Sequence, residues 1–302
     1  MLNIGRRFTI ADINNNPYLP HITDCDHVYH YTSSNSMISI LSNDGMNMWA
    51  SRVDCLNDLE EENDAVRTFQ KCCDELFYSK EIPSEFYSIV KNVRVSRVAN
   101  VDSNADYYKI LDYGAIRSSV SLCTRYVICF SKDSDSLPMW NYHSNGHSYE
   151  GVNIEIDLTE LEKNLKKEDK HGFKVNIFNV VYDDKEKAAL VKNCIRDIYH
   201  HSYERYEIMR YLEAYLNEWS VCFKNHCFEH EHEIRIVYYI PDTKPFEVSS
   251  TIEFSTMYRT HAGTFIPYIK DKFPKSIVKS ITLGPLLNTT RKESQKEIVH
   301  AV

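Results

Sequence analysis

The chain has 302 residues, 43% of them hydrophobic, so it is long enough to bury a sizeable core in one large domain or in two average ones. Its 43 acidic and 35 basic residues give a formal net charge of -8, which excludes broad, sequence-independent wrapping of nucleic acid but leaves room for a local basic groove. No stretch approaches the roughly 20 apolar residues of a membrane span, the nine cysteines have no regular spacing, and residues 1–16 lack a signal-peptide pattern, so we expect a cytoplasmic protein without a membrane partner.

The first predicted unit is a strand, a short helix and a second strand within HVYHYTSSNSMISILSNDGMNMWASR, residues 27–52. Residues 28–32 alternate as a two-faced strand does. Ser33 or Ser34 is a typical helix N-cap, and Gly45 is placed to end the helix before a strand over MNMWAS. The turn between the histidine strand and its helix is either a site for an anion or a polarised amide, or an ordinary cap above a core histidine.

The rest of the chain alternates between helical and strand-like stretches. Apolar residues at helical spacing predict a helical insertion over about residues 60–118, preceded by NDLEEENDA, which we interpret as a capped, acidic first turn. A second insertion, over 184–223, reads as one long amphipathic helix. Runs rich in β-forming residues predict further strands at 120–131, 151–158, 174–183, 232–240 and 275–284. We therefore predict an α+β protein with a single domain over 1–302, built from core motifs at 27–58, 120–183 and 222–287.

An unusual group of charges lies in NHCFEHEHEIRIVYYI, residues 225–240. If a strand covers the whole stretch, four charged residues share one side and three apolar residues share the other: Glu229, Glu231, Glu233 and Arg235 against Ile234, Ile236 and Tyr238. One interpretation is a solvated edge strand. The other is a cleft in which Glu233 polarises a substrate hydroxyl while Arg235 offsets the negative charge.

A polar and aromatic segment lies between two predicted strands, within residues 128–157. It contains side chains that could clamp a flat ring: Trp140, Tyr142, His143, Asn145, His147 and Tyr149. The alternative is a loop that binds nothing, although exposed Trp and Tyr side chains are costly unless something covers them.

Histidines and cysteines gather just before the acidic stretch: Cys222, His226, Cys227, His230 and His232. Their spacing matches no zinc finger or ribbon, so we expect no metal, and we interpret the group as surface histidines beside buried thiols. The chain also has no Gly-rich phosphate loop, no G-x-S-x-G and no H-E-x-x-H.

These pieces follow one another in a recognisable order. The motifs YHYTSSNSMISILSNDGMNMWAS, ICFSKDSDSLPMWNYHSNGHSYEGVNIEID, FKNHCFEHEHEIRIVYY and IVKSITLGP together resemble the bacterial family known as domain of unknown function 2971, over about residues 27–287. That family name implies no activity.

A more distant resemblance implies a chemistry. A strand with YHYT, followed by a helix, a glycine and another strand, is similar to the start of the DNA-targeting toxin branch of the ADP-ribosyltransferases. By this resemblance His30 would hold an NAD ribose, and the backbone around Tyr31 and Thr32 would position the nicotinamide, although many members have glycine where this chain has Tyr31. The E-H-E run resembles the superfamily's paired-acid motif, in which Glu233 would be catalytic and Glu231 would orient or deprotonate the acceptor.

The same resemblance implies a mixed or split sheet with large helical insertions, and NAD as the substrate. Further cofactor contacts would come from residues in the later motifs: Ser131, Trp140, Tyr142, Tyr149 and Arg235, with Tyr142 or Tyr149 as the middle aromatic residue of the motif. The implied function is transfer of ADP-ribose to a nucleic acid or protein, as a toxin or phage-defence effector with a partner protein in such a system. Alternatives are an NAD glycohydrolase, a non-catalytic nucleotide-binding or sensing module, and a metal-dependent enzyme that uses His226, His230 or His232.

Overall fold

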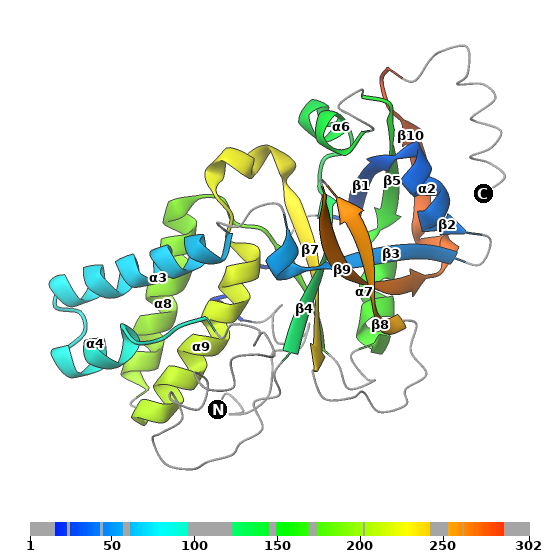
Figure 1. Ribbon diagram of the computed structural model, residues 1–302. Coiled ribbons are helices and arrows are strands. Elements are labelled where there is room, and N and C mark those ends of the chain that lie inside the picture. The colour runs from blue at the N-terminus through cyan, green and yellow to red at the C-terminus, as the bar shows by residue number, and fades with distance from the viewer. Residues whose placement is uncertain are drawn as a thin grey trace.

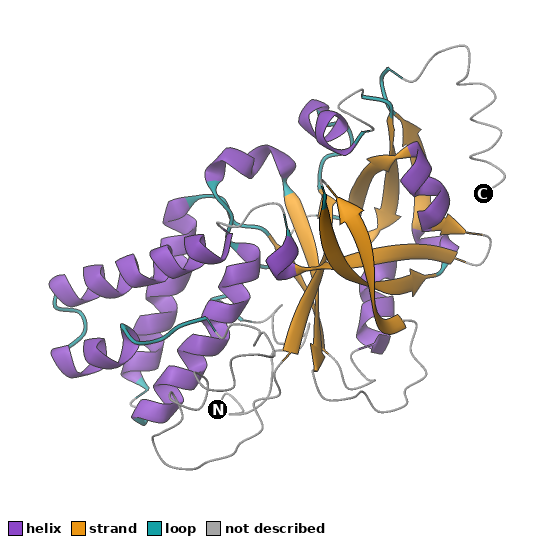
Figure 2. Ribbon diagram, in the orientation of Figure 1, coloured by secondary structure: helices purple, strands orange, loops and turns teal. Residues whose placement is uncertain are grey.

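The computed structural model describes residues 16–22, 25–42, 45–56, 61–95, 123–144, 149–168, 174–201, 203–241, 253–261 and 263–286. The predicted α+β class is confirmed: helices gather beside a curled antiparallel sheet (Figure 2). Some predicted features lie outside the described residues: Asn145, His147, residues 57–60 of the acidic turn, and residues 96–118 of the first helical insertion.

The strands form one connected sheet. They are β1 (His27–Ser33), β2 (Leu41–Ser42), β3 (Gly45–Arg52), β4 (Cys123–Ser131), β5 (Gly151–Asp157), β6 (Lys174–Asn179), β7 (Glu233–Pro241), β8 (Glu253–His261), β9 (Thr264–Phe273) and β10 (Val278–Leu283). The main order is β10-β5-β1-β4-β3-β9-β8, with β7 and then β6 added beside β4, and β2 beside β3. The sequence motifs missed the β8–β9 hairpin.

The strand pairings test the mixed alternative of the predicted mixed or split sheet. Every pairing between these described strands is antiparallel, so the prediction of a mixed sheet is wrong. The reason is the position of β4. It lies between β1 and β3 and runs antiparallel to both, and so separates the two strands that run in the same direction.

The sheet divides along β4. Strand β7 pairs with the whole of one edge of β4, from Cys123 opposite Pro241 to Ser131 opposite Glu233. On the other edge, β3 pairs at residues 126–127 and β1 pairs at Ser131. Strands β1 and β3 thus pair with the same edge of β4, but at different residues. We call the open edge between them, at residues 128–130, the split.

The first strand–helix–strand unit forms for local reasons. Ser33 caps α2 (Ser34–Ile40), and its hydroxyl accepts a hydrogen bond of 3.1 Å from the backbone N–H of Ser36. The helix ends at Ile40, earlier than predicted, because β2 follows at once and pairs with β3. Gly45 does not end the helix. It opens β3 with a φ of 153°, where a Cβ would lie 2.7 Å from the carbonyl oxygen of Phe273.

Four helices pack together at one side of the sheet (Figure 1). They are α3 (Glu61–Tyr78), α4 (Ser84–Val90), α8 (Asp184–His200) and α9 (Arg205–Cys222). The single long helix predicted over 184–223 is wrong, because the chain breaks between α8 and α9, and Glu204 starts α9 with a capping box. The helices share a core with one face of β4, β6 and β7, to which Trp219, Leu216, Val127 and Val237 belong.

The other face of the sheet forms a second core. Ile234, Ile236 and Tyr238 of β7 lie there, with leucines of α7 (Leu158–Glu168), while Val237 and Tyr239 face the helices. The predicted alternation along β7 is therefore confirmed for residues 234–239. Shorter helical segments complete the fold: α6 (Leu137–His143) and the 3₁₀ turns η1 (Val53–Cys55), η4 (His226–Glu231) and η5 (Lys275–Ile277). Among the described residues, no helix is long and apolar enough to cross a membrane.

Candidate functional site

The paired acids of the E-H-E run lie where the chain changes direction. Glu231 ends η4, His232 takes a left-handed conformation with a φ of 42°, and Glu233 begins β7. The predicted strand therefore does not extend back to Glu229 and Glu231. The left-handed residue turns the chain by an amount that strand periodicity cannot anticipate, and it brings the two carboxylates to one cation.

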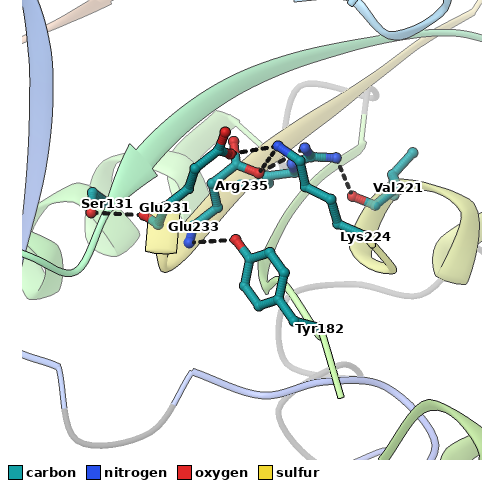
Figure 3. Close-up of polar contacts among 7 residues, drawn as sticks. All are labelled: Ser131, Tyr182, Val221, Lys224, Glu231, Glu233 and Arg235. Atoms are coloured by element: carbon teal, nitrogen blue, oxygen red, sulfur yellow. Dashed lines mark hydrogen bonds and ion pairs between the residues drawn. The ribbon is translucent and has the colours of Figure 1, made fainter. Parts of the chain in front are cut away.

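That cation is Lys224 (Figure 3). Its Nζ lies 2.5 Å from Oε2 of Glu231 and 3.1 Å from Oε2 of Glu233. Arg235 also donates to Oε2 of Glu233, at 2.8 Å, and its other terminal nitrogen donates to the carbonyl of Val221. We call Lys224, Glu231, Glu233 and Arg235 the charge cluster.

Three of the four residues of the charge cluster are buried, and Glu231 is partly exposed. Exposure is 6% for Glu233, 6% for Lys224 and 2% for Arg235. The interpretation of a solvated edge strand is therefore wrong, since β7 lies between β4 and β6 and its first residues are covered. Two acids and two bases at such depth balance one another, as buried charges in proteins generally must.

The two carboxylates have opposite pKa shifts. Burial alone would raise the pKa of Glu233, but the charges of Arg235 and Lys224 lower it to about 2. Burial and the neighbouring Glu233 raise the pKa of Glu231. Glu233 is therefore held as an anion, whereas Glu231 is the acid of the pair that takes up a proton more readily.

Backbone contacts hold the two acids in place. The hydroxyl of Ser131, at the end of β4, donates to the carbonyl of Glu231 at 2.8 Å. The backbone N–H of Glu233 donates to the hydroxyl oxygen of Tyr182 at 3.0 Å (Figure 3). Ser131 is one of the residues that the resemblance implied, but its observed role is to position Glu231. Sequence reasoning missed Lys224 and Tyr182, for which no local pattern gives a signal.

His30 lies at the split. Its Nδ1 is 3.3 Å from the carbonyl oxygen of Cys129, and its ring meets Phe130 edge to face. Burial lowers the pKa of His30 to about 4, so the ring is neutral at pH 7. A carbonyl can only accept a hydrogen bond, so Nδ1 carries the proton and Nε2 keeps a lone pair that can accept from a hydroxyl.

Cys129 and His143 connect His30 to the charge cluster. The thiol of Cys129 lowers the pKa of Glu233, while its carbonyl faces His30. His143 ends α6, which packs against β1 and η4. Desolvation lowers the pKa of His143, the charge of Glu233 raises it, and the charge of His143 in turn lowers the pKa of His30. The charge of His143 thus interacts with both predicted catalytic residues.

The strand register shows on which side of the sheet His30 and Glu233 lie. It aligns Tyr29, Ser131 and Glu233 across β1, β4 and β7, so His30, one residue further along β1, starts on the other side of the sheet from Glu233. The His30 ring lies against the backbone of β4 at the split. His30 and Glu233 therefore both lie next to β4, but they do not share one face of the sheet.

The predicted aromatic clamp is largely part of the core. Residues 137–143 form α6 rather than a loop, and Trp140 is only 3% exposed, with Nε1 donating to Asp135 at 2.7 Å. Tyr31 packs edge-on against Trp140 and donates its hydroxyl to the carbonyl of Asp133. Thr32 is buried, and Tyr149, with a φ of 56°, packs partly buried against the same group.

Tyr142 differs from these aromatic residues, because it is 49% exposed and its ring lies 5.5 Å from that of His230. It can therefore meet a molecule from solvent.

The side chains of the histidine and cysteine group differ in their burial and in their partners. Cys222 is buried, Cys227 is exposed, and the ring of His232 pairs with Asp133 at 2.8 Å. Within the described parts of the chain, no three His, Cys, Asp or Glu side chains are placed to hold a metal ion.

Comparison with known proteins gives one similarity. The model of a family described as "Protein of unknown function (DUF2971)" matches residues 139–236, from α6 to the start of β7, and so includes the whole charge cluster. No curated protein and no solved structure matches the chain.

Proposed function

We propose that this protein transfers ADP-ribose from NAD to a nucleic acid or protein acceptor, as a toxin or phage-defence effector. The observation that carries the proposal is the pair of acids at the start of β7, the strand that pairs with the edge of β4 opposite the split. Glu233, whose pKa is lowered to about 2, lies next to a second acid whose pKa is raised. His30, which starts on the other side of the sheet and contacts the same strand β4, has an Nε2 that can accept from a sugar hydroxyl. Water as the acceptor would make the same site an NAD glycohydrolase.

Each group has a role that its environment supports. When the bond between nicotinamide and ribose breaks, the electron pair leaves with nicotinamide and positive charge builds on the sugar. The Glu233 carboxylate stabilises that charge, which can contribute on the order of 3 kcal/mol. Glu231, with its raised pKa, is suited to take a proton from the attacking hydroxyl. His30 orients the ribose by accepting a hydrogen bond.

The test separates binding from transfer. Glu233→Gln keeps the size of the side chain but removes its charge, so we expect NAD binding to remain and transfer to be lost. His30→Ala should weaken NAD binding. Calorimetry measures binding, and labelled NAD with cell lysate measures transfer. Glu229→Gln, the same change at an exposed acid of η4, is the matched control. The proposal fails if the wild-type protein neither binds nor consumes NAD.

A second function is favoured by a specific observation. Glu233 is already neutralised by Lys224 and Arg235, as expected for a carboxylate that stabilises the fold of a non-catalytic nucleotide-binding module. In that case the wild-type protein binds NAD without consuming it. Glu233→Gln would then lower the melting temperature and leave NAD affinity unchanged.

A further inference from the structure

Arg259 lies on β8, which follows β9 and β3 in the strand order. Its Nη2 donates to the hydroxyl of Ser51 on β3, at 2.9 Å. Its Nε is buried and has no hydrogen-bond partner, and none of the described carboxylates contacts the guanidinium. The charge of Arg259 reaches His30, whose pKa it lowers. Because Ser51 pairs with Val127 of β4, the hydrogen bond to Ser51 places the guanidinium near the open edge of β4.

The Arg259 guanidinium keeps a buried donor, Nε, without an acceptor. A guanidinium has five N–H donors in a planar fork that fits a carboxylate or phosphate, and it cannot lose its charge in a protein. Burying part of it without a counter-ion costs free energy. Desolvation lowers the pKa of Arg259, and His30 is neutral and supplies no negative charge. The missing partner is an anion with oxygens that accept two hydrogen bonds.

Register places this anion site next to the proposed sugar site. Ser51 pairs with Val127, which is the β4 residue just before the open edge, and His30 lies against the next part of that edge at Cys129. Arg259 and Ser51 therefore form the β3 side of the split, and His30 forms the β1 side.

We propose that Arg259, supported by Ser51, binds the diphosphate of a dinucleotide whose ribose lies at His30. This inference rests on the proposed function for the identity of the ligand. In NAD the diphosphate is attached to the same ribose, through its 5′ carbon, so one molecule can fill both sides of the split. The unpaired Nε and one terminal nitrogen supply the fork that a phosphate group accepts from.

The experiment compares ligands with and without phosphate. Calorimetry would measure ADP-ribose, inorganic pyrophosphate and nicotinamide riboside, which has no diphosphate, against wild-type protein, Arg259→Gln and Arg259→Lys. Arg210→Gln, at a partly exposed arginine of α9, is the matched control. We expect Arg259→Gln to weaken ADP-ribose binding roughly 10- to 100-fold and to leave nicotinamide riboside unchanged, as loss of a charged hydrogen bond implies. Arg259→Lys should recover part of the affinity, which shows that the fold is intact.

The outcomes separate this inference from the proposed function. Arg259-dependent binding of ADP-ribose by a protein that consumes no NAD would support the anion site and refute the transferase. NAD consumption with equal ADP-ribose affinity in wild type and Arg259→Gln would overturn the anion site alone. Binding of pyrophosphate but not ADP-ribose would overturn the dinucleotide as the ligand, as would a wild-type protein that binds neither.

Discussion

Removing the charge of Lys224 is the sharpest test of the charge cluster. Lys224→Met keeps most of the side-chain volume but leaves Glu231 and Glu233 buried together with Arg235 as the remaining cation of the cluster. Breaking a buried ion pair by removing one partner costs about 3–5 kcal/mol. Because Arg235 remains, we expect a loss near the lower end, about 3 kcal/mol in the free energy of unfolding.

The pKa of Glu233 supports this magnitude. A folded value of about 2 against an ordinary value of 4.5 means that interactions with the charged form contribute roughly 3 kcal/mol, shared between Arg235 and Lys224. The folded pKa is lowered, so this stability is present above the unfolded value and is lost as the pH falls through about 2. Glu231, whose pKa is raised, takes up its proton first. The deficit of Lys224→Met should therefore be largest at neutral pH and should shrink as the pH falls and Glu231 takes up its proton.

Urea denaturation at neutral and mildly acidic pH measures both effects. Lys163→Met is the matched control, because Lys163 pairs with Glu160 on the exposed face of α7, and we expect that change to cost less than about 1 kcal/mol. The double variant Lys224→Met with Glu231→Gln should recover part of the loss, since it removes one of the unpaired charges. A loss under about 1 kcal/mol at neutral pH, or one that does not vary with pH, would refute the argument that this lysine neutralises the paired acids.

Three further predictions concern the fold. Leu216→Ala, in the core shared by the helices and the sheet, should lower one cooperative unfolding transition by about 2–5 kcal/mol, whereas two transitions would show that the helices fold separately. Ser33→Ala should cost about 1 kcal/mol through loss of the α2 cap, and an unchanged urea midpoint would contradict the observed capping bond. Under native conditions a thiol reagent should label Cys227 first, with Cys194 and Cys222 modified only on unfolding, because burial raises the pKa of both; mass spectrometry of labelled peptides would show the order.

Features that depend on neighbours in the chain could be predicted from the sequence. Ser33 caps the helix that follows β1, and residues 234–239 alternate between the two cores, because capping and strand periodicity involve residues only a few positions apart. The same reasoning failed where geometry departs from a regular period. His232 turns the chain in a left-handed conformation, so the strand assumed over Glu229 and Glu231 is a 3₁₀ turn.

Other features were decided by tertiary packing alone. The position of β4 between β1 and β3 creates the split, and strand patterns carry no information about which strands become neighbours. Packing also buried Trp140 in a side-chain core and placed Lys224 between the paired acids. Arg259 meets Ser51 across 208 positions of sequence, because contacts at that separation depend on how the whole sheet curls, which no local spacing determines.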